Sequence, residues 1–297
     1  MTSHPTARQL VDEAGTRFLQ AGLHYGHGTD NPLDEAVYLV LGALGIPFDA
    51  RQEQLDLVLD APDVERVRGL IQRRIDDCIP TAYLIHQAWF CGLCFYVDER
   101  VLIPRSPLAE LIQDGFAPWL PPRDTVSILD IGTGSGCIAI ACALAFPGAQ
   151  VDAIDVSTAA LEVARINSER HQVTDRVNLL QSDLFEKLQG RRYDLIIANP
   201  PYVGAGEYAE LPREYRHEPE SALRSGTDGL DMVRRILEYS CRHLSTTGIL
   251  VVEVGSGQDA VTECFPNLPF TWLEFEHGGE GVFLLSATDL AGVGKPG

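Results

Sequence analysis

Two prolines between an asparagine and a tyrosine, Asn199-Pro200-Pro201-Tyr202, form the segment of the sequence best suited to chemistry. The segment follows an apolar run, and proline cannot continue a sheet ladder, so it predicts a rigid turn at the carboxyl end of a strand. The Asn199 side-chain oxygen and the Pro200 carbonyl accept hydrogen bonds, and Tyr202 can stack on a plane. Together they could hold a planar –NH2 group and aim its nitrogen at an electrophile. The alternative is a plain Pro-Pro turn.

A glycine-rich turn, Gly132-Thr133-Gly134-Ser135-Gly136, leaves another apolar run and enters a helical pattern. Glycine permits tight turns and close approach to a ligand, but the third glycine comes one residue too early for a dinucleotide fingerprint. Three acids lie near the ends of successive apolar runs: Asp130, Asp155 and Asp183. This pattern predicts a pocket for an adenosine with a cationic tail, with Asp155 on the ribose and Asp183 on an exocyclic amine. The alternative is that the acids cap helices.

The elements that must position these residues begin near residue 127, where apolar runs alternate with helical patterns. Such alternation predicts an α/β fold, a mostly parallel sheet with helices on both faces. A short Gly-Gly turn before the last run predicts that the final two strands pair antiparallel. The predicted strands are 127–131, 150–155, 177–181, 193–198, 248–253, 271–276 and 281–286, and the predicted helices are about 136–146, 157–170 and 228–243.

The chain before residue 89 has a different pattern, in which apolar residues recur at helical spacing. Helices are predicted at 6–22, 33–44, 51–59 and 63–78. An aromatic and β-branched stretch follows and predicts a strand pair, 89–97 with 99–103. The sequence therefore predicts three parts: a helical domain for substrate recognition (1–88), a β-hairpin connector (89–108) and a catalytic domain (109–297) whose last residues, 287–297, form a frayed tail.

Charge is the unusual feature of the composition. The 42 acidic and 23 basic residues give a net charge of −19, and the acidic excess extends over both the helical part and the rest. Such a field repels nucleic-acid phosphates and favours a basic protein partner, so we expect an acidic rim around the Asn199 cleft. The sequence contains no apolar run long enough for a membrane span and no signal-peptide pattern. Seven scattered cysteines favour reduced thiols and a cytoplasmic location.

Several further residues leave alternatives open. Cys91 and Cys94 form a lone C-x-x-C pair, which favours strand packing over a metal site. His27 and Asp30 lie on a glycine-rich loop that either contacts a protein substrate or is only a turn. Two acids near the carboxyl edge of the sheet, Glu218 and Glu253, either line the substrate cavity or pair with one of the arginines Arg105, Arg213 and Arg216; Arg105 is a candidate to orient Glu253.

The glycine turn and the Asn199–Tyr202 segment resemble the class I S-adenosylmethionine-dependent methyltransferases that act on amino groups. The segments 90–105, Glu218-Pro219 and 226–230 are similar to the HemK-type protein glutamine methyltransferases. The segments 25–32 and 88–91, and Arg105-Ser106-Pro107, are similar to the branch of that family that methylates large-subunit ribosomal protein three. The resemblance covers roughly residues 20 to 286.

This resemblance implies a Rossmann-like seven-stranded sheet and S-adenosylmethionine as cofactor. It implies that the turn residues Gly132, Thr133, Gly134, Ser135 and Gly136 line the methionine part, with Asp130 near its amino group. Asp155 would hold the ribose, and Asp183 with Leu184 would meet the adenine. Asn199 and Pro200 would hold the glutamine amide, with Pro201 shaping the turn and Tyr202 packing beside it. Position 184 is often a larger aromatic in relatives, so this sequence departs from the pattern there.

The expected activity is therefore methylation of a glutamine side-chain nitrogen (N5) in large-subunit ribosomal protein three, before ribosome assembly. Release-factor glutamine methylation is an alternative with the same chemistry. An adenine or guanine amino methyltransferase acting on DNA or RNA is a further alternative, disfavoured by the −19 charge. A non-catalytic cofactor-binding adaptor is a third alternative. It is disfavoured because such a protein has no amino group for the Asn199–Tyr202 segment to hold. No metal and no membrane are expected.

Overall fold

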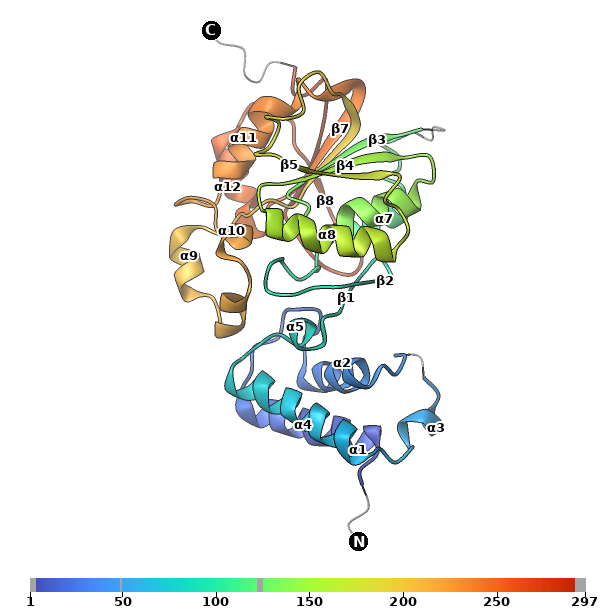
Figure 1. The fold of residues 1–297 in the computed structure, drawn as a ribbon. Coiled ribbons are helices and arrows are strands. Elements are labelled where there is room, and N and C mark those ends of the chain that lie inside the picture. The colour runs from blue at the N-terminus through green and yellow to red at the C-terminus, as the bar shows by residue number, and fades with distance from the viewer. Residues whose placement is uncertain (1–3, 49, 122–124, 292–297) are drawn as a thin grey trace.

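The computed structural model describes residues 4–48, 50–121 and 125–291. A group of helices at the N-terminal end packs below a twisted sheet flanked by helices (Figure 1). The seven-stranded sheet has the order β5-β4-β3-β6-β7-β9-β8. Five neighbouring strands are parallel, and β9 runs antiparallel to both of its neighbours. The predicted α/β fold and the antiparallel final pair are therefore confirmed.

The strands of this sheet end close to the predicted residues. The first four lie where the sequence placed them, because each is a buried apolar run bounded by turn residues. The last three differ at their ends, since β7 begins earlier and β8 is shorter. The strands are β3 (Ser127–Ile131), β4 (Gln150–Asp155), β5 (Val177–Gln181), β6 (Tyr193–Ala198), β7 (Leu244–Glu253), β8 (Thr271–Leu273) and β9 (Val282–Ser286).

Helices cover both faces of the sheet. Helices α7 (Cys137–Ala145) and α8 (Thr158–Arg170) lie on one face, and α11 (Asp231–Ser240) and α12 (Gln258–Cys264) lie on the other (Figure 1). Two apolar cores result, one built around α7 and one around α11. The sequence did not predict several short helical segments: α6 (Leu108–Gln113), α9 (Ala205–Glu210), the 3-10 turn η1 (Arg213–His217), α10 (Glu220–Leu223), the 3-10 turn η2 (Gly255–Gly257) and α12.

The N-terminal helices enclose a third core of buried aliphatic and aromatic side chains. Each long helix begins at a capping residue: the side chains of Thr6, Asn31 and Asp60 accept hydrogen bonds from the first free backbone amides. The helices are α1 (Ala7–Ala21), α2 (Pro32–Leu44), α3 (Gln52–Leu55), α4 (Ala61–Asp76) and α5 (Thr81–Ile85).

The predicted strand pair 89–97 with 99–103 is wrong. The hairpin is shorter, with β1 (Ala88–Phe90) antiparallel to β2 (Leu93–Phe95). Its two turn residues, Cys91 and Gly92, have φ of 51° and 73°, as a hairpin turn with two positive φ values requires. Beyond β2 the chain turns instead of pairing, because the Asp98 carboxylate accepts hydrogen bonds from the backbone and guanidinium of Arg100.

The predicted frayed tail is wrong for the residues that the structure describes. Residues 287–291 form a turn directly after β9, and Leu290 is fully buried in the core around α11. The Asp289 carboxylate accepts hydrogen bonds from the Ser286 amide and hydroxyl, which closes this turn. Residues 292–297 lie outside the described residues.

Candidate active site

The register of the sheet brings four strand ends together at one edge. Ile131 at the end of β3 pairs with Ile154 of β4 and with Ala198 of β6, and Ala198 also pairs with Val252 of β7. The next residues along these strands are therefore neighbours in the order Asp155, Gly132, Asn199, Glu253. At about 4.8 Å between strands, the whole row spans roughly 14 Å. This is the edge at which ligands bind in open α/β sheets.

The glycine turn is tight because its three glycines have positive φ: 73° at Gly132, 55° at Gly134 and 81° at Gly136. Gly136 caps α7, and a Cβ there would lie 3.1 Å from that of Ala164, so the turn packs close against α8. A Cβ on Gly132 would lie 4.0 Å from the Asn199 carbonyl oxygen. The predicted turn and the predicted Asn199 segment are thus in direct proximity.

Asp130 is a fully buried acid beneath this turn. Its Oδ2 accepts a hydrogen bond of 2.6 Å from the Thr133 hydroxyl, while its buried Oδ1 has no hydrogen-bond partner. Burial raises the pKa of the Asp130 carboxyl to about 7, and the Thr133 hydrogen bond opposes the shift. A buried carboxylate with one unpartnered oxygen fits a cationic group such as the amino group of S-adenosylmethionine.

Asp155 follows at the end of β4 and holds the turn in place. Its Oδ2 accepts from the Gly134 amide at 3.0 Å, and its Oδ1 accepts from the Ser157 amide at 2.8 Å. Burial raises the pKa of the Asp155 carboxyl, and these backbone hydrogen bonds oppose it. Each oxygen keeps acceptor capacity for a ribose hydroxyl.

Val156 is a candidate that the sequence analysis missed. It follows Asp155 directly and leaves 64 % of its surface exposed. An exposed aliphatic side chain beside a ribose-binding acid offers an apolar surface to an adenine ring. The signal in the sequence that could have identified Val156 is its position as an apolar residue directly after an acid at a strand end.

Asp183 lies near Asp155, since the preceding Ser182 amide donates to the Asp155 carbonyl at 3.0 Å. The half-exposed Asp183 carboxylate accepts from the Arg235 guanidinium of α11 at 3.0 Å. Leu184, which the resemblance also assigned to adenine, is largely buried and borders the same surface hollow as Asp183.

A buried acid, Glu253, ends β7 beside Asn199 on the neighbouring strand. Its carboxylate accepts hydrogen bonds from the Ser106 hydroxyl and, at 3.3 Å, from the Tyr202 hydroxyl. Burial raises the pKa of the Glu253 carboxyl, and hydrogen bonding opposes the rise. An Asn199 side chain turned with its nitrogen towards this carboxylate keeps its oxygen available as an acceptor.

Arg105 does not orient Glu253, so that prediction is wrong. Its guanidinium binds Glu218 in bidentate fashion, with Nη1–Oε1 of 2.6 Å and Nη2–Oε2 of 2.8 Å. Burial favours a higher pKa for the Glu218 carboxyl, but the charge and hydrogen bonds of Arg105, together with the neighbouring His27, lower it to about 2. Of the alternatives left open for Glu218, the structure selects pairing with Arg105. The planar fork of arginine matches a carboxylate in this way.

The segment after the Asn199 turn is anchored to the N-terminal helices. Glu214 of η1 accepts from the His24 amide at 3.0 Å and lies 3.3 Å from the buried guanidinium of Arg74 in α4. The Arg74 guanidinium also donates to Glu35 of α2 at 2.7 Å. His27 lies 3.4 Å from Glu218. The contacts of Glu214 and Glu218 join residues more than a hundred positions apart and hold the helical part against the segment after the Asn199 turn.

Two absences hold within the part of the chain that the structure describes. No group of three or more His, Cys, Asp or Glu side chains is arranged to hold a metal ion. No helix there has the length and apolar character to cross a membrane.

Comparisons with known proteins show the family and the fold. Residues 115–239 match the family model "Methyltransferase small domain". A ribosomal protein uL3 glutamine methyltransferase of Neisseria gonorrhoeae is 50 % identical over 97 % of this chain and 96 % of its own. The protein of the same name from Burkholderia pseudomallei is 47 % identical over 99 % of both chains. The crystal structure of the hMettl16 catalytic domain in complex with the MAT2A 3'UTR hairpin 6 shares the fold, with a TM-score of 0.51 and 18 % identity over 76 % of this chain and 81 % of that one.

The sheet order, the glycine turn and the row of polar residues at the sheet edge define a class I S-adenosylmethionine-dependent methyltransferase. At about half of all positions and over nearly its full length, this chain matches one kind of such enzyme. It belongs to the family of the ribosomal protein uL3 glutamine methyltransferases.

Proposed function

We propose that this protein methylates the side-chain amide nitrogen of a glutamine in the large-subunit ribosomal protein uL3, using S-adenosylmethionine. The observation that carries the proposal is the Asn199–Pro200 acceptor pair at the sheet edge, beside Glu253 and next to the glycine turn. The name of the relatives, which match at about half of all positions, supports uL3 as the substrate.

The cofactor's place is supported by groups that fit it. Asp130 offers an unpartnered buried oxygen to the amino group, Asp155 offers acceptors to the ribose, and Val156 offers an apolar surface to the adenine. Gly132 to Gly136 shape the turn around the methionine part. Asp183 pairs with Arg235 and keeps further acceptor capacity for the adenine amine. When bound, S-adenosylmethionine supplies an electrophilic methyl group on a sulfonium.

The protein's own contribution to catalysis is positioning. An amide nitrogen is a poor nucleophile because its lone pair is delocalised into the carbonyl. With one N–H donated to the Asn199 oxygen and the other to the Pro200 carbonyl, the nitrogen lone pair is aimed along one line. Held by Asn199 and Pro200, the nitrogen would face the methyl group that bound S-adenosylmethionine would supply, and its surplus proton would pass to water. Such fixed acceptors stabilise the developing positive charge.

Glu253 acts as a positioning residue in this scheme. When ionised, the Glu253 carboxylate only accepts hydrogen bonds, so it would favour the orientation of the neighbouring Asn199 amide in which the nitrogen faces Glu253. Burial raises the pKa of the Tyr202 hydroxyl, which keeps it a donor to Glu253. Pro201 restricts the turn between Asn199 and Tyr202.

We infer a separate role for each part of the chain. Residues 1–88 select the protein substrate, residues 89–108 connect the two domains, and residues 109–297 carry out the methyl transfer. The −19 charge suits a strongly basic partner met free in the cytoplasm before ribosome assembly and disfavours direct nucleic-acid binding. The likeness to a protein solved with an RNA hairpin concerns the fold alone.

Incubation with labelled S-adenosylmethionine and a mixture of ribosomal proteins, release factors and nucleic acids tests the proposal. We expect the label on a glutamine of uL3. Label on a glutamine of a release factor would mean that the reaction is as proposed but the substrate is not uL3. Label on nucleic acid would overturn the proposal.

A further inference from the structure

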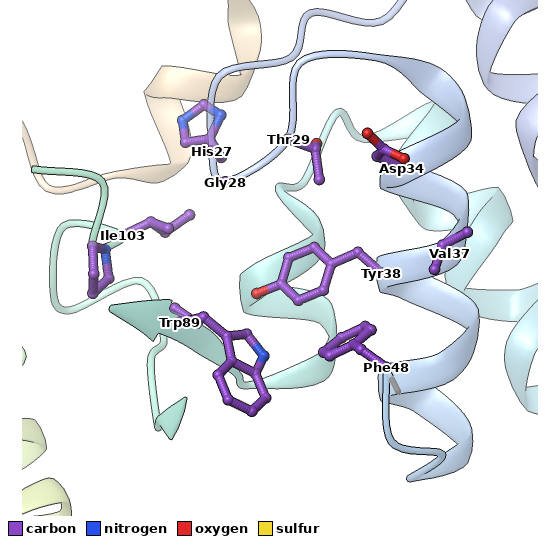
Figure 2. A pocket seen from close by; sticks show the side chains of 11 residues that line it. His27, Gly28, Thr29, Asp34, Val37, Tyr38, Phe48, Trp89 and Ile103 are labelled. Carbon is purple, nitrogen blue, oxygen red and sulfur yellow. The ribbon is translucent and has the colours of Figure 1, made fainter. Parts of the chain in front are cut away.

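A second cavity lies between the N-terminal helices and the connector, apart from the row of strand ends. It encloses about 220 Å3 and is lined by the loop before α2, by α2 itself, by the residue pair Ala88-Trp89 and by Ile103-Pro104 (Figure 2). Three aromatic rings gather along one side, while His27, Thr29 and Asp34 lie across from them (Figure 2). We refer to this cavity as the aromatic–acidic pocket.

The aromatic side of the pocket exposes large rings to solvent. Phe48 leaves 43 % of its surface exposed and Trp89 leaves 45 %. Their ring centroids lie 5.7 Å apart in an edge-to-face arrangement, and the Tyr38 ring is 5.9 Å from Phe48. Indole and phenyl faces attract lysine and arginine side chains as well as aliphatic groups.

The opposite side carries unneutralised negative charge. The Asn31 amide donates at 2.7 Å to both Asp30 and Asp34, which holds two exposed carboxylates together at the start of α2. Within residues 4–48, 50–121 and 125–291, neither acid forms an ion pair. His27 is 4 % exposed and lines the pocket, and its Nδ1 has no hydrogen-bond partner. The pocket thus combines aromatic surfaces, the exposed carboxylate of Asp34 and the buried imidazole of His27.

The pocket is tied to the catalytic edge through the connector. Pro104 lines the pocket, and Ser106, two residues further along, donates to Glu253 beside Asn199. Two extended residues span at most about 7 Å. The Ile103 amide donates at 3.0 Å to Glu218, which anchors the same segment. A peptide with its glutamine at Asn199 therefore reaches the pocket with a side chain only a few residues away.

We propose that the aromatic–acidic pocket binds a lysine or arginine side chain of uL3 that lies near the methylated glutamine. This inference rests on the proposed function and adds a specificity site to it. The cationic head meets the exposed carboxylate of Asp34, with Asp30 nearby, and its aliphatic stem packs against the exposed surfaces of Phe48 and Trp89. Charge complementarity favours this occupant, because an apolar side chain gains no attraction to these carboxylates.

The test compares pocket variants with matched controls. Trp89→Leu removes the indole face, and Asp34→Asn removes one carboxylate without changing shape. Glu65→Gln removes one charge from the exposed side of α4, far from the pocket lining, and Leu57→Ala removes an exposed apolar side chain elsewhere. We expect each pocket variant to raise KM for uL3 by roughly tenfold, with kcat and cofactor affinity unchanged. The controls should leave KM within about twofold.

The substrate side completes the experiment. Peptide mapping first locates the methylated glutamine, and its nearest lysine and arginine residues are then replaced by glutamine. We expect this neutral uL3 to bind the wild-type enzyme as weakly as uL3 binds the pocket variants, with no further loss when both changes are combined. Calorimetry follows binding independently of turnover. The pocket assignment would be overturned if the affinity losses of the pocket variant and of the neutral uL3 were fully additive when the two are combined. It would also be overturned if Asp34→Asn and Glu65→Gln gave the same KM for uL3. Absence of methylated uL3 with the wild-type enzyme would instead refute the proposed function.

Discussion

The Asp130→Asn substitution tests two effects of the buried Asp130 charge. One is the destabilisation of the cofactor-free protein, and the other is the contribution to cofactor binding. The carboxyl has an ordinary pKa of 3.8, which burial raises to about 7 in the folded chain. Three pKa units correspond to about 4 kcal/mol, so an ionised Asp130 destabilises the cofactor-free protein by roughly that amount. Below pH 3.8 both states are protonated and the cost is absent. Between pH 3.8 and 7 the unfolded chain ionises first, so stability falls as pH rises.

An asparagine at position 130 carries no charge and keeps the shape. Its hydrogen bond with Thr133 is weaker by about 1 kcal/mol, which leaves a net gain of about 2–3 kcal/mol above pH 7. We therefore expect thermal unfolding of the cofactor-free variant at pH 8 to occur roughly 5–10 °C above the wild type, with little difference at pH 4.

The same substitution should weaken cofactor binding, since the unpartnered Oδ1 no longer meets a cationic amino group as a carboxylate. We expect affinity for S-adenosylmethionine to fall by at least about tenfold. The wild-type dissociation constant should also rise as pH drops below 7, because a proton must then leave Asp130, whereas the variant should lack this trend. Equal melting temperatures at pH 8, together with unchanged affinity, would refute the role of Asp130.

Three further substitutions test the other residues of the sheet edge. Asn199→Ala should lower kcat by about a hundredfold or more while cofactor affinity measured by calorimetry stays unchanged; normal turnover would exclude the amide-holding role. Asp155→Ala should weaken cofactor binding by about 1–3 kcal/mol, and an unaltered binding isotherm would remove the ribose assignment. Glu253→Gln should lower kcat by roughly tenfold with KM for cofactor and for uL3 unchanged, because the Asn199 amide loses its fixed orientation; a rise in KM alone would contradict positioning.

The sheet could be predicted from the sequence because its strands are short apolar runs between turn residues. β3, β4, β5 and β6 lie at their predicted bounds, and the residues that follow them then meet by register alone. This is why the glycine turn, Asp155 and Asn199 could be placed at one edge without coordinates.

The misses have a different physical origin. The strand predicted at 99–103 failed because the local bond between Asp98 and Arg100 forms a turn that outweighs β propensity. The sequence left three arginines open as partners of Glu218, and the packing of segments 113 positions apart selects Arg105. The ion pair between Asp183 and Arg235 of the covering helix likewise has no signal in the sequence pattern. Such choices depend on tertiary packing, which a linear pattern does not contain.

The most direct test of the central claim is tandem mass spectrometry of uL3 after reaction with the purified enzyme. We expect one methyl group on the side-chain nitrogen of a single glutamine, and no product with Asn199→Ala. Methylation of a lysine, an arginine or the chain terminus, or an undiminished product with Asn199→Ala, would contradict the account.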